Sequence, residues 1–260
     1  MGSINRRSFL KIVSLSIYGM FAGGVFEAVR ADDFKRDSNL LVNKKLKTKR
    51  WAMAVDLTTI NENIIKNCIK KCHSMHNVPN IKDKRHEIKW IWAENFEAVF
   101  PDIDYLHLRK LQNKISSKIP VLCNHCDNPP CVRVCPTKAT FRRDDGIVTV
   151  DMHRCIGCKF CIVACPYGAR SFNFTDPRKY IEKLNYKYPT REEGVVEKCD
   201  FCIERVDLGL SPECVKVSEG SLIFGDIYNP QSEISNVLGM RDSIRRKITL
   251  GTKPQIYYLL

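Results

Sequence analysis

The chain has 260 residues, of which 44% are hydrophobic, and its formal net charge is +13. This length and hydrophobic content are typical of a folded protein of one or two domains and exclude a largely disordered chain. The positive charge does not predict a nucleic-acid partner, because no basic run is interleaved with aromatic residues as in nucleic-acid-binding motifs. Thirteen cysteines are far more than usual, so the first question is whether metal or disulfide bonds hold them.

The N-terminus has the features of an export signal. Arg6 and Arg7 precede a short apolar stretch over residues 12–28, which is followed by a plausible cleavage site. The pattern resembles a twin-arginine signal peptide over residues 1–31, a route that exports proteins already folded around their cofactors. The alternative is a membrane anchor, although the stretch contains an acidic residue and a span needs about 20 solidly apolar residues. We expect a periplasmic protein whose residues 32–50 form a basic N-terminal arm.

Short strands and loops are predicted for most of the remaining chain. Residues 139–142 and 147–150 flank an Asp-Asp-Gly turn and predict a hairpin. No long amphipathic helix is evident, although residues 105–115 have a helical pattern. Apolar segments of strand length predict further strands at residues 51–56, 88–92, 195–196 and 222–224.

Two cysteine runs in the middle of the chain have the spacing of bacterial ferredoxins. The second run reads C-x2-C-x2-C-x3-C-P, and the first differs by a longer middle step. In this pattern the last cysteine of each run binds the other cluster of the pair. The predicted ligands are Cys123, Cys126, Cys131 and Cys165 for site A, and Cys155, Cys158, Cys161 and Cys135 for site B. For the first run taken alone, half a zinc site is the alternative.

The other cysteines are interpreted through a resemblance. The sequence resembles the four-cluster ferredoxin subunits of membrane-bound oxidoreductases, such as polysulfide reductase and the nitrite-reductase electron carrier, in which the two outer runs also share ligands. The resemblance implies a site C formed by Cys199, Cys202, Cys214 and Cys72. The fourth family site keeps only Cys68, since Ser218 stands at its last ligand position and residues 51–67 contain no cysteine. Ser218 and Glu62 carry oxygen donors, but the resemblance implies three 4Fe-4S clusters, with Cys68 a leftover thiol.

The expected fold class is α+β, with tandem bacterial-ferredoxin-like cluster-binding modules, short hairpins and many loops. Residues 51–118 and 171–230 are expected to form the outer module, with one cluster retained and one lost. Residues 119–170 are expected to form the inner two-cluster module, and residues 231–260 a C-terminal docking tail.

An alternative for the first run is covalent haem, because Cys68, Cys72 and His73 form the pattern C-x3-C-H, one residue longer than the usual attachment motif. We expect His73, His76 and His125 to form hydrogen bonds or lie on the surface near clusters, without binding metal.

The residues around and between the cysteines indicate one subfamily of these ferredoxin subunits. They resemble the periplasmic iron–sulfur subunit (DsrO) of the Dsr membrane complex DsrMKJOP, which serves dissimilatory sulfur metabolism. The resemblance implies a quinone-interacting polytopic membrane subunit, a periplasmic multihaem cytochrome and other subunits of the complex as partners, and a position peripheral to the inner membrane. An electron-transfer subunit of another periplasmic oxidoreductase, of the polysulfide, nitrite or hydrogenase type, is the alternative. The segments that carry this resemblance are residues 51–56, 73–79, 89–92, 123–131, 151–155, 166–172 and 251–254.

The sequence predicts an electron carrier and not an enzyme. It contains no Ser/His/Asp set and no phosphate-binding loop, and none of the three predicted sites lacks a cysteine in a way that would open an iron to substrate. A zinc-binding interaction module and a secreted disulfide scaffold are the alternatives from other classes.

Overall fold

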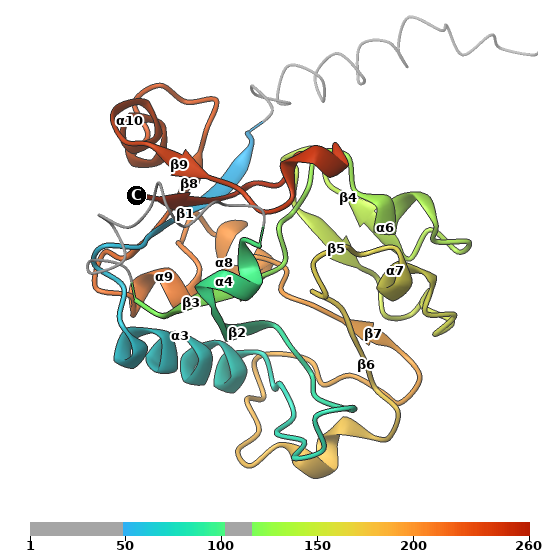
Figure 1. The fold of residues 1–260 in the computed structure, drawn as a ribbon. Helices are drawn as coiled ribbons and strands as arrows, with labels where there is room; N and C mark the ends of the chain where they lie inside the picture. The colour runs from blue at the N-terminus through green and yellow to red at the C-terminus, as the bar shows by residue number, and fades with distance from the viewer. Residues whose placement is uncertain (1–48, 102–115) are drawn as a thin grey trace, which may run out of the picture. The chain divides into compact units, whose positions relative to one another are not determined.

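The computed structural model describes residues 49–101 and 116–260 (Figure 1). The chain divides into two compact units, Met1–Lys47 and Thr48–Leu260, and the described residues belong to the second. The predicted signal peptide, most of the basic arm and the predicted helix at residues 105–115 therefore lie outside the described residues. Within the two described ranges, no helix is long and apolar enough to cross a membrane.

A four-stranded sheet joins the two ends of the described unit. Its strand order is β8 (Leu222–Asp226), β1 (Trp51–Asp56), β10 (Ile256–Leu259) and β9 (Ser243–Ile244). Strand β1 pairs antiparallel with β8 and parallel with β10. Alternate side chains of β1 face opposite sides of the sheet, as the pleat requires. Met53 and Val55 enter the main core, whereas Ala52 and Ala54 pack against Ile234 of helix α10 (Glu233–Met240).

Helix α3 (Glu62–Met75) is the longest element of the described residues, and the sequence analysis did not predict it. Its first turn is capped by Asn61, whose side chain accepts hydrogen bonds from the backbone N–H groups of residues 63 and 64. The buried face consists of Ile64, Ile65, Cys68 and Cys72, which recur at helical spacing. The periodicity is hidden in the sequence because half of the apolar stripe is cysteine, which we interpreted only as a ligand.

The predicted strands are largely confirmed. The hairpin forms from β4 (Thr140–Arg142) and β5 (Val148–Val150), and the strands at residues 51–56 and 222–224 are present. The predicted strand at residues 88–92 lies three residues later, as β2, and that at residues 195–196 lies one residue later, as β7. The other paired strands are β2 (Ile91–Asn95) with β3 (Lys118–Leu122), and β6 (Ser171–Phe172) with β7 (Val196–Glu197).

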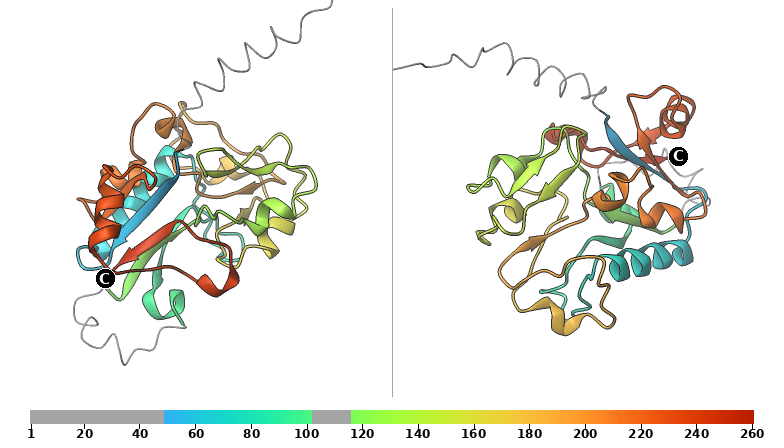
Figure 2. Two further views of the ribbon diagram at one scale, coloured as in Figure 1. Left: turned by 90° about the horizontal axis from the view of Figure 1, so that it is seen from above. Right: turned by 180° about the vertical axis from the view of Figure 1, so that it is seen from behind.

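Several short helices follow the cysteine-containing loops. Together with the short, mostly antiparallel strands, they make the fold α+β, as predicted. The hairpin β4–β5 and helices α6 (Pro130–Arg133) and α7 (Phe160–Val163) lie together on one side of the described unit, and α10, β9 and the C-terminus lie on the opposite side (Figures 1 and 2). The remaining short helices are α4 (Phe96–Val99), η1 (Pro177–Tyr180), α8 (Ile203–Val206), α9 (Glu213–Lys216) and η2 (Ile248–Leu250).

The C-terminal segment, predicted to be a docking tail, is part of the folded unit. It supplies α10, β9 and β10, and Tyr258 is fully buried. Its hydroxyl donates to the carbonyl of Pro120 at 3.1 Å. Whether residues 231–260 also contact a partner stays a prediction.

Candidate metal centres

Site A lies where the first inner cysteine run leads into α6. Its four predicted ligands, Cys123, Cys126, Cys131 and Cys165, line one cavity together. The buried Tyr167 lies beside them, and its hydroxyl contacts the hydroxyl of Thr252 in the C-terminal segment. Burial, reinforced by the neighbouring thiols, raises the pKa of Cys126 to about 12. This thiol therefore holds its proton until a metal displaces it.

Site B lies between the hairpin and α7. Its four predicted ligands, Cys135, Cys155, Cys158 and Cys161, also line one cavity. Gly157 has a φ of +68°, and a Cβ there would collide with the carbonyl of Gly194, so only glycine fits between two of these ligands. The backbone N–H of Thr140 donates to the Cys135 sulfur at 3.4 Å. Burial by itself would raise the pKa of Cys135, but this N–H and neighbouring donors lower it.

Site C combines helix α3 with the last cysteine run. Cys72 lies on the buried face of α3, whereas its predicted partners Cys199, Cys202 and Cys214 lie before α8 and within α9. All four thiols are buried. Burial raises the pKa of Cys72 well above its usual value, and the three partner thiols raise it further. The fold therefore brings Cys72 within electrostatic range of the other three.

The donor chemistry fits three 4Fe-4S clusters. All thirteen cysteines are free thiols, and twelve of them gather in three sets of four, where a disulfide scaffold would present pairs. Three closely spaced cysteines with a distant fourth are typical of cubane clusters. Among the described residues, Arg170 Nη2 and the side-chain amide of Asn124 are buried in or beside site A without a hydrogen-bond partner. Cluster sulfurs would accept from these N–H groups, which otherwise carry the cost of an unmade hydrogen bond. The ligand assignments themselves stay predictions.

The donors at the predicted fourth family site form hydrogen bonds or an ion pair within the protein. The hydroxyl of Ser218 donates to the carbonyl of Val215 at 2.7 Å and accepts from the N–H of Leu222 at 3.0 Å. The Cys68 sulfur donates to the carbonyl of Cys214 at 3.3 Å. Glu62 is at the start of α3, half exposed and paired with a lysine one turn later. These donors are therefore engaged within the protein, in line with the expected loss of this cluster.

His76 and His125 form hydrogen bonds, as predicted, whereas the absence of metal binding stays a prediction, because the donor atoms of His76, Cys202 and Glu204 lie within 4.8 Å of one another. His76 is buried, and its Nε2 lies 3.1 Å from a carboxylate oxygen of Glu204. His125 Nδ1 accepts from the N–H of Val148 at 3.1 Å, and burial lowers the pKa of His125 well below its usual value. His73 is also kept neutral, because burial lowers its pKa to about 4. Cys68 and Cys72 are turned into the core by α3, an arrangement that does not favour covalent haem.

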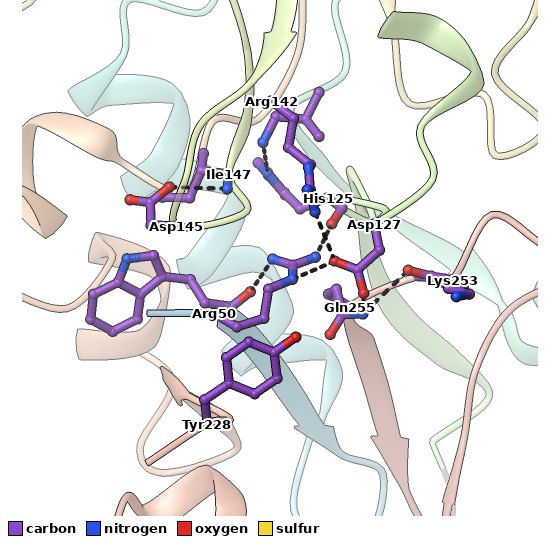
Figure 3. A network of polar contacts seen from close by, with 12 residues as sticks. Arg50, His125, Asp127, Arg142, Asp145, Ile147, Tyr228, Lys253 and Gln255 are labelled. Atoms are coloured by element: carbon purple, nitrogen blue, oxygen red, sulfur yellow. Dashed lines mark hydrogen bonds and ion pairs between the residues drawn. The ribbon is translucent and has the colours of Figure 1, made fainter. Parts of the chain in front are cut away.

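A polar network holds the site A loop against the ends of the described unit (Figure 3). Arg50, just before β1, donates to Asp127 at 2.6 Å and to the carbonyl of His125 at 2.7 Å. Gln255, just before β10, donates to the other oxygen of Asp127 at 2.8 Å. Gly146 in the hairpin turn makes room for the Arg50 guanidinium, since a Cβ there would overlap it. The loop that carries three site A cysteines is thus anchored to the sheet.

Arg170 is a functional candidate that the sequence analysis did not single out. Its side chain is buried and donates to the Thr140 hydroxyl at 3.1 Å. Burial by itself would lower the pKa of Arg170, but its electrostatic interactions with Cys131, Cys161 and Cys123 outweigh burial and raise the pKa. The guanidinium thus lies within reach of ligands of both site A and site B. Its sequence signals are its position five residues after the last ligand of site A and its place in the motif at residues 166–172.

Comparison with known proteins identifies the family. Residues 116–227 match the 4Fe-4S dicluster domain family. Over 232 residues the chain is 41% identical to the Hdr-like menaquinol oxidoreductase iron-sulfur subunit 1 of Archaeoglobus fulgidus, a match that covers 81% of this chain and 83% of that relative. This protein belongs to the same family of iron–sulfur subunits. Within the family it functions as an electron-transfer subunit of an oxidoreductase complex, as predicted.

Two further relatives of this iron–sulfur family set the range of the resemblance. The iron-sulfur cluster-binding subunit of menaquinone reductase from Nitratidesulfovibrio vulgaris is 32% identical over 244 residues, which are 83% of this chain and 90% of that relative. A polysulfide reductase subunit of Wolinella succinogenes is 42% identical over 137 residues, which are 52% of this chain and 63% of that relative. The wider family resemblance is confirmed, whereas the subfamily, the number of clusters and the export route stay predictions.

Proposed function

We propose that this chain relays single electrons through three 4Fe-4S clusters, between a quinone-interacting membrane subunit and redox partners in dissimilatory sulfur metabolism. The observation that carries the proposal is the grouping of twelve thiols into three complete sets of four. Each cluster, when bound, supplies a one-electron couple whose potential depends on nearby charges, hydrogen bonds and solvent. The names of two relatives refer to menaquinol and menaquinone, which supports a quinone-linked complex.

The three sites follow one another in the order C, A, B. Burial and closer charged groups raise the pKa of the Cys199 thiol in site C, and Cys123 in site A raises it further. Cys199 and Cys123 are therefore within electrostatic range of each other. Arg170 in turn reaches Cys131 of site A and Cys161 of site B. These contacts support a relay in which site A lies between the other two.

The residues around the sites support a carrier rather than a catalyst. Each of the three sites has four thiols, so a bound cluster would keep no iron open to substrate. The spacing of the two inner runs favours iron over the zinc alternative, since three closely spaced cysteines with a distant fourth line each cavity.

Site B is the end of the relay that reaches the surface. Cys158 is exposed, and the neighbouring apolar side chains of Ile156, Phe160 and Val163 are exposed as well. Exposed apolar residues around a redox centre are typical of a surface that a partner covers. We infer that the quinone-interacting membrane subunit docks here, and that a periplasmic multihaem cytochrome and other subunits of the complex contact the rest of the chain.

Iron content and spectroscopy of the purified full-length protein test this function. We expect about 12 iron atoms and about 12 sulfides per chain, a broad brown absorbance, and three one-electron centres by EPR. Menaquinol added to membranes that contain the whole complex should reduce these centres. A colourless protein with tetrahedral zinc would refute the electron-transfer proposal. About 8 iron atoms per chain would refute the count of three.

Export is tested separately. Replacing Arg6 and Arg7 by lysine should leave the protein in the cytoplasm with its clusters, as judged by cell fractionation and iron content. Unchanged delivery to the periplasm would contradict the twin-arginine route. Retention of the N-terminus in the mature protein, seen by mass spectrometry, would favour the membrane anchor.

A further inference from the structure

Buried charges distinguish site C from sites A and B. Arg170 is 5% exposed and lies between ligands of sites A and B, where it adds a permanent positive charge. Its Nη1 is held by the hydroxyl of Thr140, whereas its Nη2 has no hydrogen-bond partner among the described residues. A buried guanidinium with an unused N–H group needs a negative acceptor beside it. The ligand sulfurs of the two sites provide one.

Asp200 adds the opposite charge at site C. It lies between Cys199 and Cys202 in the sequence and is 6% exposed. One carboxylate oxygen accepts from the N–H of Cys202 at 2.9 Å, and the other accepts from the hydroxyl of Tyr188 at 3.0 Å. No cation in the described part of the chain forms an ion pair with it. Both hydrogen bonds are donated to the carboxylate, and they hold its oxygens beside the site C thiols.

A second buried cation does not cancel this difference. The ammonium of Lys198 donates to the carbonyl of Cys199 at 2.7 Å and also contacts the carbonyl of Val148, which lines site A. Lys198 therefore lies between sites C and A and acts on both.

His76 also faces site C, with its Nδ1 3.7 Å from the Cys72 sulfur, but its Nε2 lies 3.1 Å from the carboxylate of Glu204, so this pair adds no net positive charge. Arg170 remains the cation beside sites A and B, and Asp200 the unpaired anion at site C.

We propose that Arg170 and Asp200 set a potential step along the relay, with the cluster at site C lower in potential than the clusters at sites A and B. A positive charge favours the added electron, and a negative charge disfavours it, most strongly in a site shielded from water. Electrons that enter the relay would rest on the A and B pair, at the surface end. This inference rests on the proposed three-cluster function. Arg170 and Asp200 would tune the midpoint potentials of the clusters without binding iron.

EPR-monitored redox titration of the full-length holoprotein tests the potential step. Arg170→Gln should shift the midpoint potentials of two clusters downward, and Asp200→Asn should shift that of the third cluster upward. Cys72→Ala, which lacks the site C cluster, identifies the signal of that third cluster. Arg170→Lys keeps the charge and should retain the wild-type potentials. Arg178→Gln, at an exposed arginine paired with Asp176, is the matched control and should shift none.

The outcomes separate the inference from the function on which it rests. Iron well below about 12 atoms in the wild-type protein would refute the three-cluster function itself. Wild-type iron content with unmoved potentials in both charge variants would overturn the potential step alone, as would downward shifts from Asp200→Asn. If Arg170→Gln loses iron, Asp200→Asn and Arg170→Lys decide, because an amide is nearly the same size as a carboxylate and lysine keeps the positive charge. A simple structural role for either residue would not move potentials in opposite directions.

Discussion

Substitution of the two cysteines of helix α3 tests the assignment of site C directly. Cys68 and Cys72 lie one turn apart on the same buried face, so serine at either position places a hydroxyl in a similar environment. Cys72 lies within electrostatic range of all three thiols of Cys199, Cys202 and Cys214, whereas Cys68 lies beside Cys214. Cys68 instead donates to a backbone carbonyl at 3.3 Å. The two substitutions therefore lie in similar environments, but only Cys72→Ser removes a predicted cluster ligand.

The expected magnitudes follow from these contacts. Cys72→Ser removes one of four ligands, so iron content should fall from about 12 to about 8 atoms per chain. The loss of a cluster also removes the metal-binding energy from the fold around α3, which is several kcal/mol for a structural metal site. Cys68→Ser should keep about 12 iron atoms. A hydroxyl at that position keeps the hydrogen bond to the carbonyl, and the exchange of sulfur for oxygen in an apolar site costs about 1–2 kcal/mol.

Iron analysis, sulfide analysis and EPR of both purified variants provide the measurement. Cys72→Ala accompanies Cys72→Ser, because a serine oxygen can itself bind iron and would hide the loss. Far-UV circular dichroism of each variant shows whether α3 persists. Equal iron losses from the Cys68 and Cys72 variants would refute the pairing of the outer cysteine runs. An iron loss from Cys68→Ser alone would reverse the assignment.

Three further predictions follow from individual contacts. Glu197→Gln leaves the guanidinium of Arg191, now 2.7 Å from the carboxylate, buried without its counter-charge, and should destabilise the protein by about 3 kcal/mol; a urea midpoint close to that of the wild type would contradict it. Burial by itself would raise the pKa of Asp56, but Arg241 and neighbouring hydrogen bonds outweigh burial and lower the pKa to about 2. The ion pair of Asp56 with Arg241 therefore stabilises the fold fully above the pKa of about 4 of an unperturbed aspartate. This stabilisation is lost as the pH falls toward about 2. Arg241→Met should remove about 1 kcal/mol at pH 7, after allowance for solvent screening, and should flatten the acid side of the stability profile measured by thermal unfolding, whereas an unchanged profile would exclude the pair as its cause. Gly157→Ala should lower iron content to about 8 atoms per chain, because the added methyl collides with a backbone carbonyl at site B, and full iron content would show that the loop can adjust.

The local features of this protein were predictable from its sequence. The inner cysteine runs have a spacing that only a few kinds of metal site require, and the hairpin has a turn with a glycine at a φ of +86°. Both features involve neighbouring residues, whose geometry depends on bond lengths, allowed backbone angles and short loops. For the same reason the family assignment was possible from motifs alone. The predicted pairing of Cys72 with the last run was different, since it depended on a resemblance and not on spacing.

Only the tertiary structure decided the features that join distant parts of the chain. Helix α3 packs its apolar face, which includes Cys68 and Cys72, against the main core. Packing of this kind supplies most of the stability of a helix, so α3 could be identified only once the core was known. The pairing of β1 with β10 brings together residues about 200 positions apart, which no local pattern can indicate. Arg170 lines the site A cavity and donates to Thr140 of the site B cavity, a position that only the folded chain creates. Sequence spacing determined which residues can bind metal, whereas long-range packing determined which charges surround them, because electrostatic interactions depend on distance in space and not along the chain.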